Sequence, residues 1–238
     1  MKIIINADDY GLNSNVNKAI YLCFKKELIS STTMLANMPA FEEALNMSRE
    51  INITNNIGLH FNLVEGFPLT KRIKECSRIC NSEGEFIYSR RKFRFWTKKE
   101  RYCIKEELLA QINMLKKNGI PITHFDSHRH IHTDFHLFIL IFRTLKKNRI
   151  DKIRISRNNN MNNSLIKVLY KIIFNKMINL IGFKTTKKFA SLFDLVFEKA
   201  ESIELMCHPE KINGEEILDS SGKNIIRIKD KLISYKYL

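Results

Sequence analysis

The sequence KIIINADDYG, residues 2–11, has the composition of a buried β-strand that ends in two acidic residues and a turn. Asn13 or Ser14 can then cap a helix, because apolar residues recur after them at the i, i+3 and i+4 spacing of one helix face: Val16, Ala19, Ile20, Cys23 and Phe24. This stretch therefore predicts a strand, a turn and a helix, with Asp8 and Asp9 just after the strand.

The same alternation of strands and helices is predicted along the rest of the chain. Further strands are expected at Thr32–Ala36, Ile57–Leu63, Lys152–Ser156 and Ser202–Cys207, and further helices after Pro39 and at Lys99–Lys117, Phe135–Leu145 and Leu165–Leu180. Lys184–Lys199 fits neither pattern clearly. Strands that alternate with helices indicate an α/β fold, in which a parallel sheet with helical crossovers is either open and doubly wound or closed into a barrel.

The composition predicts a soluble cytoplasmic protein. A chain of 238 residues can form one large domain or two small ones. The five cysteines have no disulfide spacing, and the apolar run near the N-terminus ends at Asn6, too early for a signal peptide. The longest apolar run, Leu137–Phe142, is far shorter than the ~20 residues that cross a bilayer, so no membrane partner is expected.

The net charge of +15 raises the question of a nucleic-acid partner. Basic residues are densest between Lys146 and Lys188, where Asp151 is the single acidic residue. No aromatic pattern of an RNA-binding domain accompanies them, and no helix-turn-helix, zinc-finger or glycine-rich nucleotide motif occurs. We therefore expect a solvated basic surface and no specific nucleic acid.

Residues 123–132, THFDSHRHIH, contain four of the seven histidines. If this stretch is extended, alternate side chains share one face of a strand: His124, Asp126, His128, His130 and His132. Neutral imidazole is the commonest metal-binding side chain, and a nearby carboxylate can fix its tautomer. A solvated loop or a set of hydrogen-bonded core histidines is the alternative, but so dense a cluster favours a metal site.

Other polar residues are predicted at the carboxyl ends of strands, where parallel α/β folds assemble their sites. Asp8 and Asp9 follow the first strand, His60 comes late in the third, and His208 follows Ser202–Cys207. One carboxylate and two imidazoles leave positions open for water and substrate, as a catalytic Zn²⁺ requires. An acidic turn at a helix N-terminus and a core histidine are the structural alternatives for Asp8-Asp9 and His60.

Four blocks of sequence resemble the YdjC-like carbohydrate deacetylases, which include the chitooligosaccharide deacetylases. The blocks occur in the family's order and cover essentially the whole chain: Asn6–Leu12 (NADDYGL), Gly58–Leu63 (GLHFNL), Thr123–His132 and Glu204–Pro209 (ELMCHP). Glu65–Leu69 (EGFPL) and Gly84–Phe86 (GEF) also resemble that family's substrate loop.

This resemblance implies a variant (β/α) barrel as a single domain, residues 1–238, with a substrate-loop insertion at about 64–98. It implies removal of the acetyl group from an N-acetylated sugar, such as a short chitooligosaccharide, with one divalent metal ion: Zn or Mg foremost, with Mn, Co or Ni as alternatives. Asp9, His60 and His128 would bind the metal. Asp8 would act as general base, and His208 as general acid or oxyanion partner. Asp126 would orient a metal ligand. Substrate binding is implied for four residues: Asp126, His130, His132 and Arg154.

The chain departs from the family pattern at Glu210, where a glycine usually follows His208-Pro209, and no block aligns between Leu165 and Asp194. Two other functions stay open at this stage. One is a metal-dependent phosphodiesterase, which two closely spaced metals would favour, and the other is a basic nucleic-acid-binding protein with a structural metal. A homodimer is also compatible with the sequence.

Overall fold

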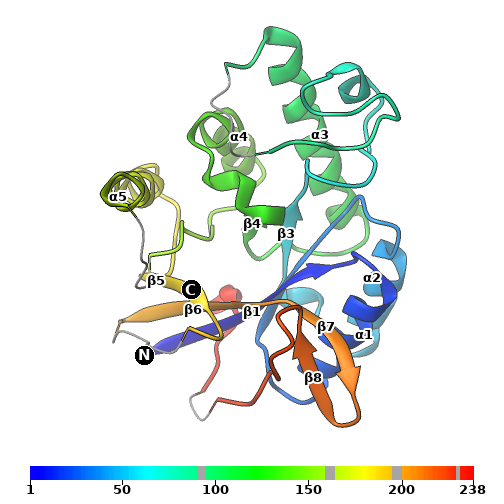
Figure 1. The fold of residues 1–238 in the computed structure, drawn as a ribbon, viewed down its shortest axis with the longest axis vertical. Helices are drawn as coiled ribbons and strands as arrows, with labels where there is room; N and C mark the ends of the chain where they lie inside the picture. The colour runs from blue at the N-terminus through cyan, green and yellow to red at the C-terminus, as the bar shows by residue number, and fades with distance from the viewer. Residues whose placement is uncertain (90–94, 159–163, 195–199, 229–230) are drawn as a thin grey trace.

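The computed structural model describes residues 1–89, 95–158, 164–194, 200–228 and 231–238. A six-stranded parallel sheet forms its centre, with the strand order β4-β3-β2-β1-β6-β5 (Figure 1). The strands are β1 (Lys2–Tyr10), β2 (Ser31–Met34), β3 (Ile57–Phe61), β4 (Phe125–Ser127), β5 (Lys188–Ser191) and β6 (Ser202–Cys207). The sheet curves into a half-barrel, so the predicted α/β class with parallel strands is confirmed.

In the described part of the chain, five α-helices accompany the sheet: α1 (Ser14–Lys25), α2 (Phe41–Glu50), α3 (Lys98–Lys117), α4 (Phe135–Lys147) and α5 (Leu165–Leu180). Asn13 caps α1 by accepting a hydrogen bond from the Val16 amide, as one of the two predicted caps. Thr97 and Glu100 form a reciprocal capping box at α3. Short 3₁₀ helices lie at Thr54–Asn56, Arg72–Glu75, His128–Thr133 and Tyr235–Tyr237.

The two faces of the sheet differ in chemistry. Ile3, Ile5 and Ala7 of β1 belong to the main hydrophobic core, together with apolar residues of α1 and α2. Asn6 and Asp8, on the opposite face of β1 because strand side chains alternate, are fully buried beside polar residues of neighbouring strands. Buried polar groups must find partners, so this inner face is where a site can be assembled.

Most predicted elements coincide with observed ones, although the boundaries differ. β5 lies in the region that fitted neither pattern, whose residues 195–199 lie outside the described residues. The antiparallel hairpin of β7 (Pro209–Asn213) and β8 (Glu216–Asp219) was not predicted. Within the described part of the predicted loop at 64–98, which excludes residues 90–94, the single regular element before α3 is the 3₁₀ helix Arg72–Glu75.

Two strand predictions were wrong. The histidine stretch is extended only at Phe125–Ser127, because Arg129 and His130 take left-handed backbone conformations with φ of 48° and 54° and turn the chain into a 3₁₀ helix. His124, Asp126, His128, His130 and His132 therefore do not share one face. Lys152–Ser156, all of it described, forms no regular strand and makes only isolated parallel bridges, Phe125 with Ile153 and Lys152 with Lys184.

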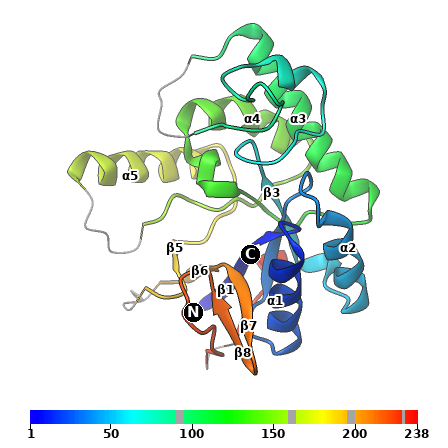
Figure 2. The same ribbon diagram turned by 45° about the vertical axis from the view of Figure 1, so that its right-hand side comes forward.

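Helix α5 lies at the edge of the molecule in both ribbon views (Figure 2). Phe174 and Ile178 pack inward, whereas Leu165, Ile166 and Leu180 are more than half exposed. Among the described residues, no helix has the length and apolar character needed to cross a membrane.

Candidate active site

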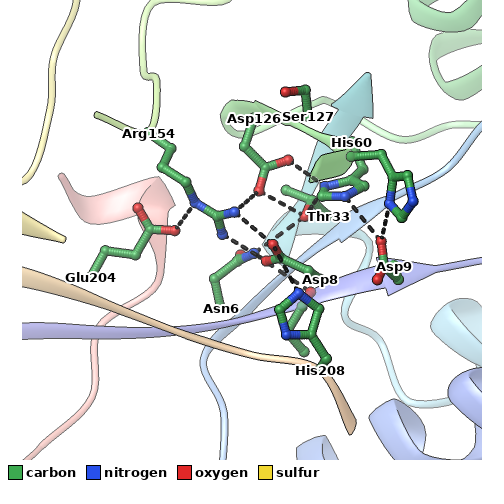
Figure 3. Close-up of polar contacts among 12 residues, drawn as sticks. Asn6, Asp8, Asp9, Thr33, His60, Asp126, Ser127, Arg154, Glu204 and His208 are labelled. Carbon is green, nitrogen blue, oxygen red and sulfur yellow. Dashed lines mark hydrogen bonds and ion pairs between the residues drawn. The ribbon is translucent and has the colours of Figure 1, made fainter. Parts of the chain in front are cut away.

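Polar side chains from four strands meet at the carboxyl edge of the sheet (Figure 3). Asp8 and Asp9 come from the end of β1, His60 from β3, Asp126 from β4, and His208 directly follows β6. His128 follows β4 as the first residue of a 3₁₀ helix. The predicted convergence of residues far apart in sequence is thus present in the structure.

The backbone at the end of β1 separates the two adjacent aspartates. The pairing of β1 with β2 shifts its register between Ala7 and Tyr10, and Asp9 has a φ of 70°. Aspartate tolerates this left-handed conformation better than most residues. Asp8 consequently turns into the buried inner face, while Asp9 faces the two histidines.

Asp9, His60 and His128 form a compact set of donors. Asp9 Oδ1 lies 3.0 Å from His60 Nε2 and 2.8 Å from His128 Nδ1. The three ligand atoms all lie within 4.8 Å of one another. One carboxylate oxygen facing two imidazole nitrogens fits a divalent metal ion such as Zn²⁺ and leaves further coordination positions for water and substrate.

Asp126 fixes the orientation of His60. Its Oδ1 lies 2.6 Å from His60 Nδ1, so this nitrogen carries the proton and Nε2 is left to face Asp9. Burial disfavours a charge on His60, but the carboxylates of Asp126 and Asp9 outweigh it and raise the pKa of His60 to about 10. Asp126 thereby occupies the place expected of a residue that orients a metal ligand.

Glu65 has the corresponding position behind His128. Its Oε1 lies 2.8 Å from His128 Nε2, and this contact lowers the pKa of Glu65. The pKa of His128 is raised, because the contacts with Asp9 and Glu65 outweigh burial. Glu65 was predicted only as part of a substrate loop. The position of Glu65 in the sequence could have indicated its role. It lies four residues after the end of β3, where a carboxylate can reach the edge of the sheet.

Arg154 binds Asp8 through two parallel hydrogen bonds. Its Nη1 donates to Asp8 Oδ2 at 2.6 Å and its Nη2 to Asp8 Oδ1 at 2.7 Å, and Asn6 Nδ2 donates to the same Oδ1 at 2.9 Å. Burial would raise the pKa of Asp8, but the charge and hydrogen bonds of Arg154 outweigh it and hold that pKa well below its usual range. Asp8 is therefore ionised at neutral pH.

His208 lies on the open side of Asp8, with Nε2 3.9 Å from Asp8 Oδ2 and a side chain that is 34% exposed. Its backbone amide donates to Asp219 Oδ2 of β8 at 2.6 Å. The β7–β8 hairpin thus holds the turn at His208, and Glu210, the departure from the family pattern, lies within β7. Asp8, Asp9, His208 and the apolar Leu12, Val16 and Pro209 line a cavity of about 150 Å³.

The predicted substrate contacts lie at different depths. Asp126, His132 and Arg154 are fully buried, as is Asp8, and their predicted contacts with a substrate stay predictions. His132 Nδ1 lies 2.6 Å from Ser127 Oγ, and Arg154 contacts three buried carboxylates. Both side chains therefore provide partners for buried polar groups. His130 is partly exposed and packs edge-on against Phe189, so its predicted contact stays a prediction.

A second group of donors, Asp8, His60 and Asp126, also has metal-binding distances. The guanidinium of Arg154 already contacts both of these carboxylates, so a cation is present there without a metal. This arrangement disfavours the pair of metals that the phosphodiesterase alternative requires.

The fold and the donor set define a parallel α/β protein with a candidate mononuclear metal centre at the carboxyl edge of its sheet. The family model of YdjC-like proteins matches residues 2–231, and the chain belongs to that family.

Individual relatives agree with this membership. The chain is 29% identical over 233 residues to a carbohydrate deacetylase of Clostridium beijerinckii, covering 97% of this chain and 89% of that protein. It is 32% identical over 217 residues to a carbohydrate deacetylase of Halalkalibacterium halodurans, covering 90% of this chain and 86% of that protein. A crystal structure from Enterococcus faecalis V583, named as a proposed cellobiose-phosphate cleavage protein, superposes with a TM-score of 0.68 at 24% identity and covers 89% of this chain and 82% of that chain. At this identity the last match supports the fold alone.

Proposed function

We propose that the protein is a metal-dependent hydrolase that removes the acetyl group from an N-acetylated sugar, with a short chitooligosaccharide as its substrate. The observation that carries the proposal is that His60 and His128 both face one carboxylate oxygen of Asp9. An ionised Asp8 and a partly exposed His208 lie beside this set. The relatives named carbohydrate deacetylases support the sugar substrate.

The metal would be held by Asp9, His60 and His128, with Asp126 and Glu65 orienting the two imidazoles. A divalent ion bound there supplies a Lewis acid for the acetyl carbonyl and lowers the pKa of water to about 7. Zn²⁺ suits a set of one carboxylate and two imidazoles, and Mg²⁺, Mn²⁺, Co²⁺ or Ni²⁺ are alternatives.

Asp8 and His208 have complementary roles in proton transfer. Asp8 is ionised, so it can accept the proton of the attacking water. His208 lines the same cavity and can donate a proton to the nitrogen of the leaving sugar amine. The bond between the acetyl carbon and that nitrogen breaks, and acetate and a free amino sugar are the products.

The surroundings of Asp8 suit an acetyl group. The cavity of about 150 Å³ combines the polar atoms of Asp8 and His208 with the apolar Leu12 and Val16, so it can take a methyl group beside a carbonyl. The proposed substrate loop, residues 64–98, adjoins this site through Glu65 and would contact the sugar.

Acetate release from diacetylchitobiose by the purified protein tests the proposal. We expect release that stops after chelation, returns on addition of a divalent metal, and is lost in His128→Ala. Absence of release from every N-acetyl sugar tried, with a metal-loaded and folded protein, would count strongly against it.

A further inference from the structure

We infer that Glu204 and Tyr235 are positioning residues of the active site, which hold Arg154 in place against Asp8 and Asp126. The inference assigns a role to the C-terminal end of the chain, which lies far in sequence from every metal ligand. It rests on the proposed function for its effect on turnover and on the structure alone for its effect on metal binding.

Arg154 is the centre of a buried cluster of three carboxylates from three strands (Figure 3). Besides its two bonds to Asp8, its Nη1 lies 2.7 Å from Asp126 Oδ2, and its Nε donates to Glu204 Oε1 at 2.7 Å. All of these side chains are shielded from solvent. The position of one guanidinium therefore affects both Asp8, the proposed base, and Asp126, which orients His60.

Glu204 is in turn held by Tyr235. The Tyr235 hydroxyl donates to Glu204 Oε2, the oxygen that Arg154 does not use. Tyr235 is fully buried, and its backbone amide donates to Ser31 Oγ at 3.1 Å. Each oxygen of Glu204 thus has its own strong donor, and the side chain has one fixed orientation.

The ring of Tyr235 makes a second connection to Asp8. It stacks on His124 with the ring centroids 3.8 Å apart and the planes 7° from parallel. His124 Nε2 lies 3.0 Å from Asn6 Oδ1, and Asn6 Nδ2 donates to Asp8 Oδ1. Since the amide nitrogen of Asn6 is a donor here, its oxygen accepts from His124, which fixes the His124 tautomer. Tyr235 therefore supports Asp8 by two separate routes.

The charge of the cluster explains why the hydroxyl matters. Burial raises the pKa of Glu204 to about 7, and Arg154 and the Tyr235 hydroxyl limit that rise. Loss of the hydroxyl would favour protonated Glu204, which is a weaker acceptor for Arg154 Nε. The guanidinium of Arg154 would then be less firmly held. The side chains of Asp8 and Asp126, which it contacts, would also be less firmly held.

Tyr235→Phe tests this, because it keeps the stacked ring and removes only the hydroxyl. Tyr237→Phe is the matched control, since Tyr237 lies in the same 3₁₀ helix and is 65% exposed. For both variants, kcat and KM are measured with diacetylchitobiose, and the dissociation constant of Zn²⁺ is measured by calorimetry on chelator-treated protein. Thermal unfolding establishes that each variant is folded.

In Tyr235→Phe we expect kcat to fall about 10-fold with KM changed less than about 2-fold, and Zn²⁺ affinity to fall several-fold, as for other residues that orient metal ligands indirectly. Tyr237→Phe should match the wild type in all three. A folded Tyr235→Phe with wild-type kcat and Zn²⁺ affinity overturns the inference, and so does a lowered melting temperature alone.

Two further outcomes keep the inference separate from the proposed function. If the wild type releases no acetate, the proposed function fails, and the Zn²⁺ affinity of Tyr235→Phe against Tyr237→Phe still decides the inference. If Tyr235→Phe does not fold, Glu204→Gln replaces it, since glutamine keeps the shape and removes the charge. The same changes in kcat and Zn²⁺ affinity are then expected, and their absence overturns the inference.

Discussion

His60 and His128 face the same oxygen of Asp9 from two regions that are built in different ways. His60 lies in β3, and Asp126 of the neighbouring β4 fixes its second nitrogen. His128 begins a 3₁₀ helix with left-handed residues, and its second nitrogen contacts Glu65, a 36% exposed side chain on the loop after β3. We call the first region, together with the buried Arg154 and His124, the rear wall, and the second the rim.

Because the two regions are built differently, substitutions in the rear wall should mainly lower folding stability, and substitutions at the rim should mainly weaken metal binding. The rear wall consists of buried charges that strands hold in place, so a substitution there leaves unpaired charges in the interior. The rim depends on one loop carboxylate in contact with solvent, so a substitution there should alter metal binding and leave the fold intact. Variants on the two sides should therefore fail in different ways.

The largest effect is expected for Arg154→Met in the rear wall. It leaves Asp8, Asp126 and Glu204 buried without their cation, which costs about 3–5 kcal/mol. For a chain of this length the melting temperature should fall by about 10 °C or more, as measured by circular dichroism. Arg157→Met is the control, because Arg157 is 31% exposed and its pair with Asp194 should contribute at most about 1 kcal/mol. Equal shifts in the two variants would contradict a buried charge cluster.

A smaller effect is expected for Glu65→Gln at the rim. Loss of the carboxylate behind His128 should weaken Zn²⁺ binding about 10-fold, with little change in melting temperature. Glu83→Gln is the control, because Glu83 is an exposed residue of the same loop that bonds only its neighbour Ser82 among the described contacts. If calorimetry gives Glu65→Gln the Zn²⁺ affinity of the wild type, Glu65 does not support metal binding.

The smallest effect concerns the pH dependence of the rear wall. Burial, with the charge of Arg154, holds the pKa of His124 well below its usual value. The unfolded chain binds a proton at His124 below about pH 6.5 and the folded chain does not, so this contribution is full above that pH and is lost as the pH falls. His60 acts oppositely, since its pKa is raised to about 10: its contribution is full below about pH 6.5 and is lost as the pH rises through 10.

Comparison with His124→Gln isolates the contribution of His124. Between pH 7.5 and 5.5 the wild type should lose about 1 kcal/mol more of its free energy of unfolding than the variant, as measured by urea titration. Parallel pH profiles would show that His124 binds its proton equally well in the folded and the unfolded chain.

The sequence was informative about the residues at strand ends but not about Glu65, the position of Arg154 or the turn after His128. Asp8, Asp9, His60 and His208 could be predicted as site residues because each stands at the end of a strand that hydropathy reveals. Arg154 was assigned to the substrate side by the family resemblance alone. Its burial depends on carboxylates from β1, β4 and β6, which only the sheet order brings together.

The turn after His128 was missed for a local reason. Left-handed backbone is usually marked by glycine or asparagine, and here Arg129 and His130 adopt it. The role of Tyr235 could not be predicted from the sequence either. Its hydrogen-bond partner Glu204 is 31 residues away, and its ring stacks on His124, which is farther still along the chain.

The most direct test of the metal centre is a crystal structure of the Zn²⁺-loaded protein with diffraction data on both sides of the zinc absorption edge. We predict a single anomalous peak about 2.0–2.2 Å from ligand atoms of Asp9, His60 and His128, with Arg154 still between Asp8 and Asp126. A peak among Asp8, His60 and Asp126 with Arg154 displaced, or no peak at this edge of the sheet, would contradict the assignment.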